Sequence, residues 1–105
     1  MIGRAMTEID EYVMDVLMRD LVGHDKRPAS FLVYLWLAGE GQRRGGEVQI
    51  SYQELAESIG VSKSSAQMAV GWLVRRKLLK ATKANATAVP CYEVQSPWRT
   101  RGTRS

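Results

Sequence analysis

The sequence predicts a single domain of the α+β class that is mainly helical and ends in a two-stranded hairpin. Apolar side chains recur every three or four positions in several segments before residue 79, which is the period of an amphipathic helix. Residues 79–84 and 89–95 are expected to be two strands that flank a short turn at residues 85–87. A chain of 105 residues is long enough for one hydrophobic core, and no repeat or linker divides it.

Residues 7–23 are expected to form an additional N-terminal helix. Thr7, followed three residues later by Asp10, is a helix-start pattern. The apolar positions of this helix are spaced by three and four residues: Ile9, Val13, Val16, Leu17 and Leu21. Met14 and Met18 widen the apolar stripe, either to fill the core or to contact a second copy of the chain.

A more apolar helix is expected to begin at Pro28, a residue that suits a first helical turn. Its apolar residues cover most of its circumference and predict a central, buried element: Phe31, Leu32, Leu35, Trp36 and Ala38. We expect it to stop at a glycine-rich loop, residues 39–46, which is followed by a short strand at 47–50. No Gly-Lys-Ser/Thr follows the glycines, so no nucleotide site is predicted. Arg43 and Arg44 could touch a nucleic-acid backbone or remain solvated.

Residues 51–79 are expected to form two helices joined by a tight turn. Ser51 and Glu54 have the spacing of a capping box, in which each side chain bonds the other residue's backbone N–H. Gly60 supplies the left-handed conformation that ends the first helix, and Ser62 caps the second. These signals predict both helix boundaries from local sequence alone.

The second of these helices combines an apolar inner face with a polar outer face. The predicted inner face is Ala66, Ala69, Val70, Leu73 and Lys77. The opposite side carries Ser64, Met68, Gly71 and Arg75, flanked by Gln67, Trp72 and Arg76. A merely solvated helix would favour long charged residues. Gly71 costs about 1 kcal/mol relative to alanine, which indicates close approach of a partner or tight packing against the preceding helix.

Charge is distributed unevenly along the chain, whose formal net charge is +4. Residues 1–25 carry a net charge of −4, and residues 62–105 carry +8. A basic C-terminal half is typical of a protein that binds a polyanion, although a solvated basic surface is the alternative. In the basic tail, residues 96–105, Trp98 is expected to fold back onto the core. The tail's arginines are expected to stay mobile: Arg99, Arg101 and Arg104.

The composition argues against catalysis and against a membrane protein. His24 is the sole histidine and is expected to be solvated, while the single Cys91 has no basic neighbour and fits a reducing compartment. No Cys/His set or paired carboxylates appear, so no catalytic residue, metal, cofactor or small-molecule ligand is predicted. The longest apolar run, residues 31–38, is too short to span a bilayer, and no signal peptide is recognised. A cytoplasmic protein is expected.

The stretch ISYQELAESIGVSKSSAQ, residues 50–67, and the Leu78-Leu79 step into the hairpin resemble the winged helix-turn-helix superfamily. They are most similar to small bacterial and phage domains related to the MarR, GntR and plasmid replication-initiator groups. The resemblance covers residues 28–95 and implies a winged helix core with a C-terminal two-stranded wing. The sequence departs from the pattern at Ala66, where the superfamily shares Val or Ile, and at Lys77, where Gly usually precedes the wing.

The resemblance implies that the second helix enters the major groove of double-stranded DNA while the wing reaches phosphate or the minor groove. Gln67 suits a bidentate adenine contact, and Lys63 suits a phosphate or a guanine edge. The N-terminus of the preceding helix would meet a phosphate. The predicted DNA-binding residues are Ser51, Tyr52, Lys63, Ser64, Ser65, Gln67, Met68, Arg75, Lys83, Asn85 and Thr87.

Two functions remain open from the sequence. The first is sequence-specific DNA binding by a nucleoid-associated transcription regulator or replication-initiator-like module. The second is a winged helix used for protein–protein contact in a larger complex, for which an exposed Met68 beside an exposed Trp72 would be typical. The polar outer face and basic C-terminal half favour DNA. A homodimer through the N-terminal helix is also expected, because an isolated winged helix usually needs two half-sites.

Overall fold

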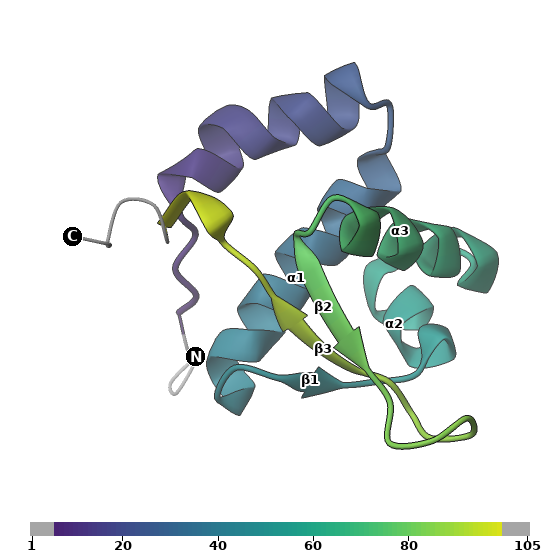
Figure 1. Ribbon diagram of the computed structural model, residues 1–105. Helices are drawn as coiled ribbons and strands as arrows, with labels where there is room; N and C mark the ends of the chain where they lie inside the picture. The colour runs from purple at the N-terminus through teal and green to yellow at the C-terminus, as the bar shows by residue number, and fades with distance from the viewer. Residues whose placement is uncertain (1–5, 100–105) are drawn as a thin grey trace.

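Figure 1 shows the computed structural model, which describes residues 6–99 of the chain. The elements follow the order η1 (Val13–Leu17), η2 (Arg19–His24), α1 (Pro28–Arg44), β1 (Val48–Gln49), α2 (Tyr52–Ile59), α3 (Lys63–Arg75), β2 (Leu79–Thr82) and β3 (Cys91–Val94). Helix α1 crosses the middle of the domain, with α2 and α3 on one side and the N-terminal helix on another. The predicted fold class is confirmed: an α+β winged helix-turn-helix with an additional N-terminal helix.

The sheet joins β1 to the two strands of the wing in the order β1-β3-β2, and both pairings are antiparallel. Val48 lies opposite Tyr92, and Leu79 lies opposite Val94. The wing strands are shorter than predicted because residues 83–90 form a loop. Pro90 belongs to this loop, and its carbonyl accepts the N–H of Ile50 at 3.1 Å. A proline has no N–H to offer a sheet, which explains its place outside the strand.

Helices α2 and α3 have the predicted caps. The Ser51 Oγ accepts the Glu54 N–H at 3.1 Å, and Ser62 Oγ accepts the Ser65 N–H at 3.1 Å. Gly60 ends α2 with a φ of 94°, the left-handed conformation that glycine adopts without strain. The capping box, the Gly60 turn and the Ser62 cap therefore lie where the sequence predicts them.

The inner face of α3 is buried as predicted, except at its C-terminal end. Ala66, Ala69, Val70 and Leu73 are buried and face the core. Lys77 is exposed, so its prediction as an inner-face residue was wrong. Its φ is 60°, which places a lysine in the left-handed conformation where the superfamily usually has glycine. The turn into the wing therefore carries conformational strain at Lys77.

Helix α1 is longer than predicted and absorbs most of the expected glycine-rich loop. It continues past Gly39 to Arg44, and Gly45 closes it with a φ of 88°. Within this part, Glu40 forms ion pairs with Arg44 at 2.9 Å and with Arg43. These pairs, one helical turn apart, offset the low helix propensity of the glycines. They also hold both arginines along α1.

The N-terminal helix starts later than predicted. Residues 7–10 have no regular secondary structure, and the helix begins at Glu11. Asp10, rather than Thr7, caps it, because its Oδ1 accepts the Tyr12 N–H at 3.2 Å. The N–H groups of η1 and η2 bond carbonyls five residues earlier, as from Met18 to Val13, which makes wide helical turns. Three residues at four-residue spacing enter the core: Val13, Leu17 and Leu21.

The two ends of the described chain are joined by a group of side chains that we call the end clasp: Asp10, Tyr12, Trp98 and Arg99. The Trp98 ring stacks on Tyr12 with centroids 4.4 Å apart, and its Nε1 donates to Asp10 Oδ2 at 2.9 Å. Arg99 Nε donates to the same oxygen at 2.7 Å. The expected return of Trp98 to the core is confirmed. Arg99, expected to be mobile, pairs with Asp10 while its side chain is 64% exposed. Arg101 and Arg104 lie outside the described residues.

Candidate nucleic-acid interface

A cleft of about 240 Å³ brings together three of the predicted DNA-binding segments, and we call it the wing cleft. The N-terminus of α2 contributes Ser51 and Tyr52, α3 contributes Lys63, and the wing contributes Lys83 and Thr87. The wing loop, residues 83–90, folds toward the helix pair beyond the ends of β2 and β3 (Figure 1). Five predicted residues from distant parts of the sequence therefore line one surface depression.

The wing cleft has the charge of an anion site. Neither Lys63 nor Lys83 forms an ion pair within residues 6–99, and both are exposed. The Lys83 ammonium donates to the Ala86 carbonyl at 3.3 Å, which holds it at the base of the wing loop. The N-termini of α2 and α3 add positive ends of helix dipoles. Glu54 offsets part of this charge, because its carboxylate belongs to the capping box.

The outer face of α3 is exposed and partly polar, as predicted. Ser64 and Gln67 are exposed, and neither forms a hydrogen bond to another structural element within the described part of the chain. Met68 is 62% exposed. Ser65 is half-buried, and its hydroxyl accepts a hydrogen bond from the Ser62 Oγ at 3.0 Å. This face can offer an amide and small hydroxyls to base edges, which is the chemistry of direct readout.

Trp72 is half-buried, contrary to the exposed side chain predicted for it. Its ring is contacted by two guanidinium groups, from Arg27 at 4.4 Å and from Arg75 at 5.5 Å. Its Nε1 donates to Asp25 Oδ2 at 3.4 Å, and Arg76 forms an ion pair with the same carboxylate. No local sequence pattern indicates that Trp72 is enclosed, because Asp25 and Arg27 lie more than forty positions earlier in the chain. Arg75 is therefore held against the ring at the end of α3.

The carboxylate of Asp25 bonds three side chains near the end of α3: His24, Trp72 and Arg76. The His24 Nδ1 lies 3.0 Å from Asp25 Oδ1, and this hydrogen bond, with the attraction of Arg76, holds the pKa of Asp25 below its ordinary value. His24 itself is exposed, as predicted. The carboxylate therefore stays ionised and fixes the end of η2 to the end of α3.

The tip of the wing is folded by two of its predicted contact residues. Asn85 Oδ1 accepts the Thr87 N–H at 3.0 Å and the Thr87 hydroxyl at 3.1 Å. This is a turn in which an asparagine side chain replaces a backbone carbonyl. Thr87 lines the wing cleft, whereas Asn85 does not. Asn85 therefore shapes the wing rather than lining the cleft.

Gly71 faces open space. A Cβ placed on it would meet only the Arg75 Nη1, at 3.9 Å, among atoms within 4 Å. Tight packing against the preceding helix, one of the two interpretations of this glycine, is therefore wrong within the described residues. Close approach of a partner to this face is consistent with the geometry.

A second cleft, of about 170 Å³, lies between α3 and the N-terminus of α1, and sequence reasoning missed it. We call it the α1 cleft; its lining comes from two places in the chain. The residues are Lys26, Arg27, Pro28, Ala29 and Ser30 together with Ser65, Met68 and Ala69. The Lys26-Arg27 pair directly before Pro28 is the one sequence signal that could have indicated it. Two predicted contact residues, Ser65 and Met68, line this cleft rather than the wing cleft.

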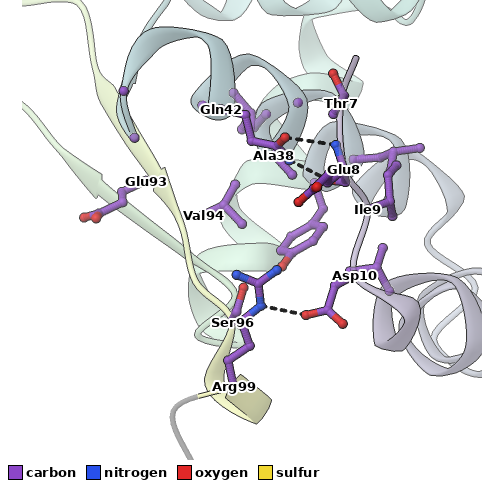
Figure 2. Close-up of a pocket in the computed structure, with 18 residues that line it drawn as sticks. Thr7, Glu8, Ile9, Asp10, Ala38, Gln42, Glu93, Val94, Ser96 and Arg99 are labelled. Carbon is purple, nitrogen blue, oxygen red and sulfur yellow. Dashed lines mark hydrogen bonds and ion pairs between the residues drawn. The ribbon is translucent and has the colours of Figure 1, made fainter. Parts of the chain in front are cut away.

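A larger cavity, of about 380 Å³, lies where both ends of the described chain meet α1 (Figure 2). Its polar groups are bonded to one another. Gln42 Nε2 donates to the Glu8 carbonyl at 2.6 Å, the Glu8 N–H donates to Gln42 Oε1 at 3.0 Å, and Arg99 pairs with Asp10. None of the predicted DNA-binding residues lines it. This cavity therefore lies where the two ends of the described chain pack on α1, and not on the α3 surface.

Metal and thiol chemistry find little support in the residues that the structure describes. No group of three or more His, Cys, Asp and Glu side chains in residues 6–99 could hold a metal ion. Cys91 lies in β3 with its Sγ 3.5 Å from Glu47 Oε1, and burial together with this carboxylate raises the pKa of its thiol. A raised pKa disfavours the reactive thiolate. Across the same residues, no helix has both the length and the apolar character needed to cross a membrane.

Comparison with known proteins adds a weak structural likeness. No protein-family model and no curated protein matches this chain. Among solved structures, the chain is similar to the crystal structure of the AntR antimony-specific transcriptional repressor. The match has a TM-score of 0.47 and 19% identity, and covers 97% of this chain and 81% of that chain. A likeness at this level carries no argument about function, which is inferred from the residues of this chain.

Proposed function

We propose that this protein binds double-stranded DNA, with α3 in the major groove and the wing cleft on the sugar-phosphate backbone. The observation that carries the proposal is the wing cleft itself. It unites the N-terminus of α2, Lys63 at the start of α3 and Lys83 of the wing in one depression. The ammonium groups of Lys63 and Lys83 form no ion pair within residues 6–99 and lie beside two helix N-termini. This arrangement suits the binding of a phosphate.

The outer face of α3 supplies the groups that would distinguish base pairs. B-DNA has a major groove about 12 Å wide, which admits an α-helix. Gln67 would read adenine through a bidentate contact, while Ser64 would bond either a base or a phosphate. Arg75, held against Trp72, would contact the backbone at the other end of the helix. Close approach of DNA at Gly71 would explain why a glycine occupies the middle of α3.

Sequence-specific binding would make the protein a transcription regulator or a replication-initiator-like module of the kind found in the MarR, GntR and plasmid initiator groups. A role of this kind places it in the cytoplasm, on the nucleoid. The net charge of +8 on residues 62–105 supports a polyanion as the partner. No cofactor or small-molecule ligand is required for such binding.

A duplex titration at two salt concentrations tests the proposal. The variant Lys63→Ala/Gln67→Ala/Arg75→Ala should fold normally and lose at least about tenfold in affinity, with a smaller salt dependence because phosphate contacts are removed. The control is Arg19→Ala/Arg43→Ala, which also removes two positive charges, one from η2 and one from the C-terminal end of α1. It should bind nearly as tightly as the unaltered protein. Equal affinity of the two variants would exclude the α3 face as the interface.

Protein–protein contact within a larger complex is the second candidate function. The 62% exposed Met68 favours it, because methionine is common in protein interfaces. Trp72, which would have strengthened this interpretation, is instead enclosed by Arg27 and Arg75. A protein that fails to bind any random-sequence duplex at low salt would favour this second function over the first.

We also propose that the N-terminal helix forms a homodimer interface, which would provide the two half-sites of a DNA operator. Met14 is 47% exposed and Val22 is 40% exposed on this helix. Removal of the whole helix is a poor test, because Val13, Leu17 and Leu21 belong to the core. Light scattering of the full chain and of the Met14→Glu/Val22→Glu variant is a better test, because it measures the oligomeric state without removing core residues. A dimer should become a monomer with unchanged folding, and a full chain that is already monomeric would refute the proposal.

A further inference from the structure

Ser30 is a buried polar side chain without a partner. It is 1% exposed, and its Oγ has no hydrogen-bond partner among the described residues. A hydroxyl removed from water without a hydrogen bond destabilises the folded state, so such groups are rare unless a ligand completes them. Ser30 is also one of the residues that line the α1 cleft, so its side chain lies beside a depression that a ligand could occupy.

The same cleft lies at the N-terminus of a long helix. Helix α1 has 17 residues, and Ser30 lies in its first turn. The residue that precedes the helix, Arg27, does not cap it with its side chain, and Pro28 has no N–H to bond. The positive end of the helix dipole is therefore directed at the cleft with no cap from the side chain of the N-cap residue. This arrangement favours an anion.

Cationic side chains flank the cleft. Lys26 is exposed and has a φ of 57°, so a lysine occupies a conformation that glycine adopts more easily. Arg27 is stacked on Trp72. The nearest carboxylate in sequence, Asp25, is already engaged by His24, Trp72 and Arg76. A lysine in a strained backbone conformation is consistent with a functional role for its positive charge, such as binding an anion.

The α1 cleft and the wing cleft lie on opposite flanks of the outer face of α3. Ser65 lines the first and Lys63 lines the second, and at 100° per residue they point about 200° apart around the helix. Ser64 and Gln67 lie between them. A helix in the major groove has a phosphate backbone on each side, because the two strands form the two edges of the groove. The two clefts are therefore placed on the two sides of α3 where the two backbones would lie.

We propose that the α1 cleft binds a backbone phosphate of the DNA strand opposite the one held by the wing cleft, an inference that rests on the proposed function. Ser30 Oγ would donate its unused hydrogen bond to a phosphate oxygen, and Lys26 would pair with the same group. The apolar lining, from Pro28, Ala29 and Met68, would contact the adjoining deoxyribose. The protein then grips both edges of the major groove, with α3 between them.

Duplex titrations of Ser30→Ala and Lys26→Gly, each with a thermal unfolding measurement, test the assignment. Ser30→Ala should keep or raise the unfolding midpoint, because the hydroxyl has no partner among residues 6–99, yet lose about fivefold in affinity. Lys26→Gly should also raise the midpoint and lower the slope of log affinity against log salt by about 0.9. Lys26→Arg should restore the slope. Arg19→Gln, which removes one charge from η2, is the control and should leave the slope unchanged.

Contrary results separate the two proposals. If Ser30→Ala binds DNA as tightly as the unaltered protein, or if Lys26→Gly and Arg19→Gln have the same slope, the α1 cleft is not a phosphate site. The same titration series includes Lys63→Ala/Gln67→Ala/Arg75→Ala. A loss of binding in that variant alone would leave the proposed function intact and overturn only this inference. Absence of duplex binding by the unaltered protein would overturn both.

Discussion

Side-chain hydrogen bonds hold both the α2–α3 unit and the end clasp together. The two regions differ in how far apart the bonded residues lie in the sequence. Ser51 with Glu54 and Ser62 with Ser65 are three residues apart. Asp10 is 88 residues from Trp98 and 89 residues from Arg99. The first region can form its caps as soon as its helices form, whereas the second needs the whole chain to be folded.

The comparison distinguishes contacts that neighbouring residues determine from contacts that form only when the tertiary fold brings distant residues together. A local cap adds a hydrogen bond with little loss of chain entropy, while a contact between chain ends must offset the entropy of closing a long loop. The surface proposed to bind DNA is therefore built on the locally encoded region. The clasp fastens the N-terminal helix to α1 on the far side of the domain. Substitutions in the two regions should thus separate stability from binding.

The largest effect is expected for Trp98→Ala in the end clasp. Trp98 stacks on Tyr12 and lies 6.4 Å from Tyr34, so its loss removes contacts with both the N-terminal helix and α1. A fully buried aromatic residue costs about 3–5 kcal/mol when truncated; for this half-buried ring we expect about 2 kcal/mol. Chemical denaturation measures the change in unfolding free energy.

Trp98→Phe is the matched control, because it keeps a ring on Tyr12 and loses the Nε1 bond to Asp10. It should lose less than half of the stability lost by Trp98→Ala. DNA affinity should be unchanged in both variants, since the clasp contributes no residue to either cleft. A drop in affinity with unchanged stability would show that the two regions are coupled.

Gly60→Ala should have the next largest effect, within the locally encoded region. The φ of 94° forces any other residue into the left-handed conformation, which costs about 1–2 kcal/mol for alanine. Gly60→Asn should cost less, because asparagine tolerates this conformation best among the other residues. Equal unfolding midpoints for the alanine and asparagine variants would contradict a conformational origin of the effect.

Gly71→Ala should have the opposite sign. This glycine has no positive φ, and a Cβ would meet nothing closer than 3.9 Å, so the gain in helix propensity should stabilise the protein by up to about 1 kcal/mol. If DNA approaches α3 closely at this position, the same methyl group should weaken binding about tenfold. A variant that is more stable and binds normally would remove Gly71 from the interface. Stability and affinity are measured on the same preparation.

The extent to which the structure could be predicted follows the same division. The caps at Ser51 and Ser62 and the turn at Gly60 were predicted correctly, because each depends on neighbours within a few residues. The end of α1 was predicted incorrectly, because glycines at 39 and 41 were interpreted as a loop. The ion pairs of Glu40 with Arg43 and Arg44, together with Thr7 packed against Gly39, favour helix there instead.

The candidate site was predicted in part, for a related reason. The outer face of α3 follows from helical periodicity, and the wing residues follow from the hairpin. The enclosure of Trp72 and the α1 cleft depend on Asp25, Arg27 and Ser30, which reach α3 only through the tertiary fold. No local pattern marks a serine that will be buried without a partner. The structure was needed to place these residues beside α3.

The smallest expected effect is the acid sensitivity of the clasp. The hydrogen bond from Trp98, followed by that from Arg99, lowers the pKa of Asp10 from 3.8 to about 2. Because the folded state holds the carboxylate ionised more strongly than the unfolded chain does, this stabilisation is complete above about pH 4 and disappears as the pH falls toward 2. Asp10→Asn should therefore lower the unfolding midpoint at pH 5, and the difference from the unaltered protein should shrink between pH 4 and pH 2. Asp15→Asn, on η1, is the control for removing one carboxylate from the same helix. A difference that stays constant down to pH 2 would mean that Asp10 stabilises the clasp through hydrogen bonds that do not depend on its charge. No difference at pH 5 would mean that the Trp98–Tyr12 stack, which the variant keeps, holds the chain ends together by packing alone.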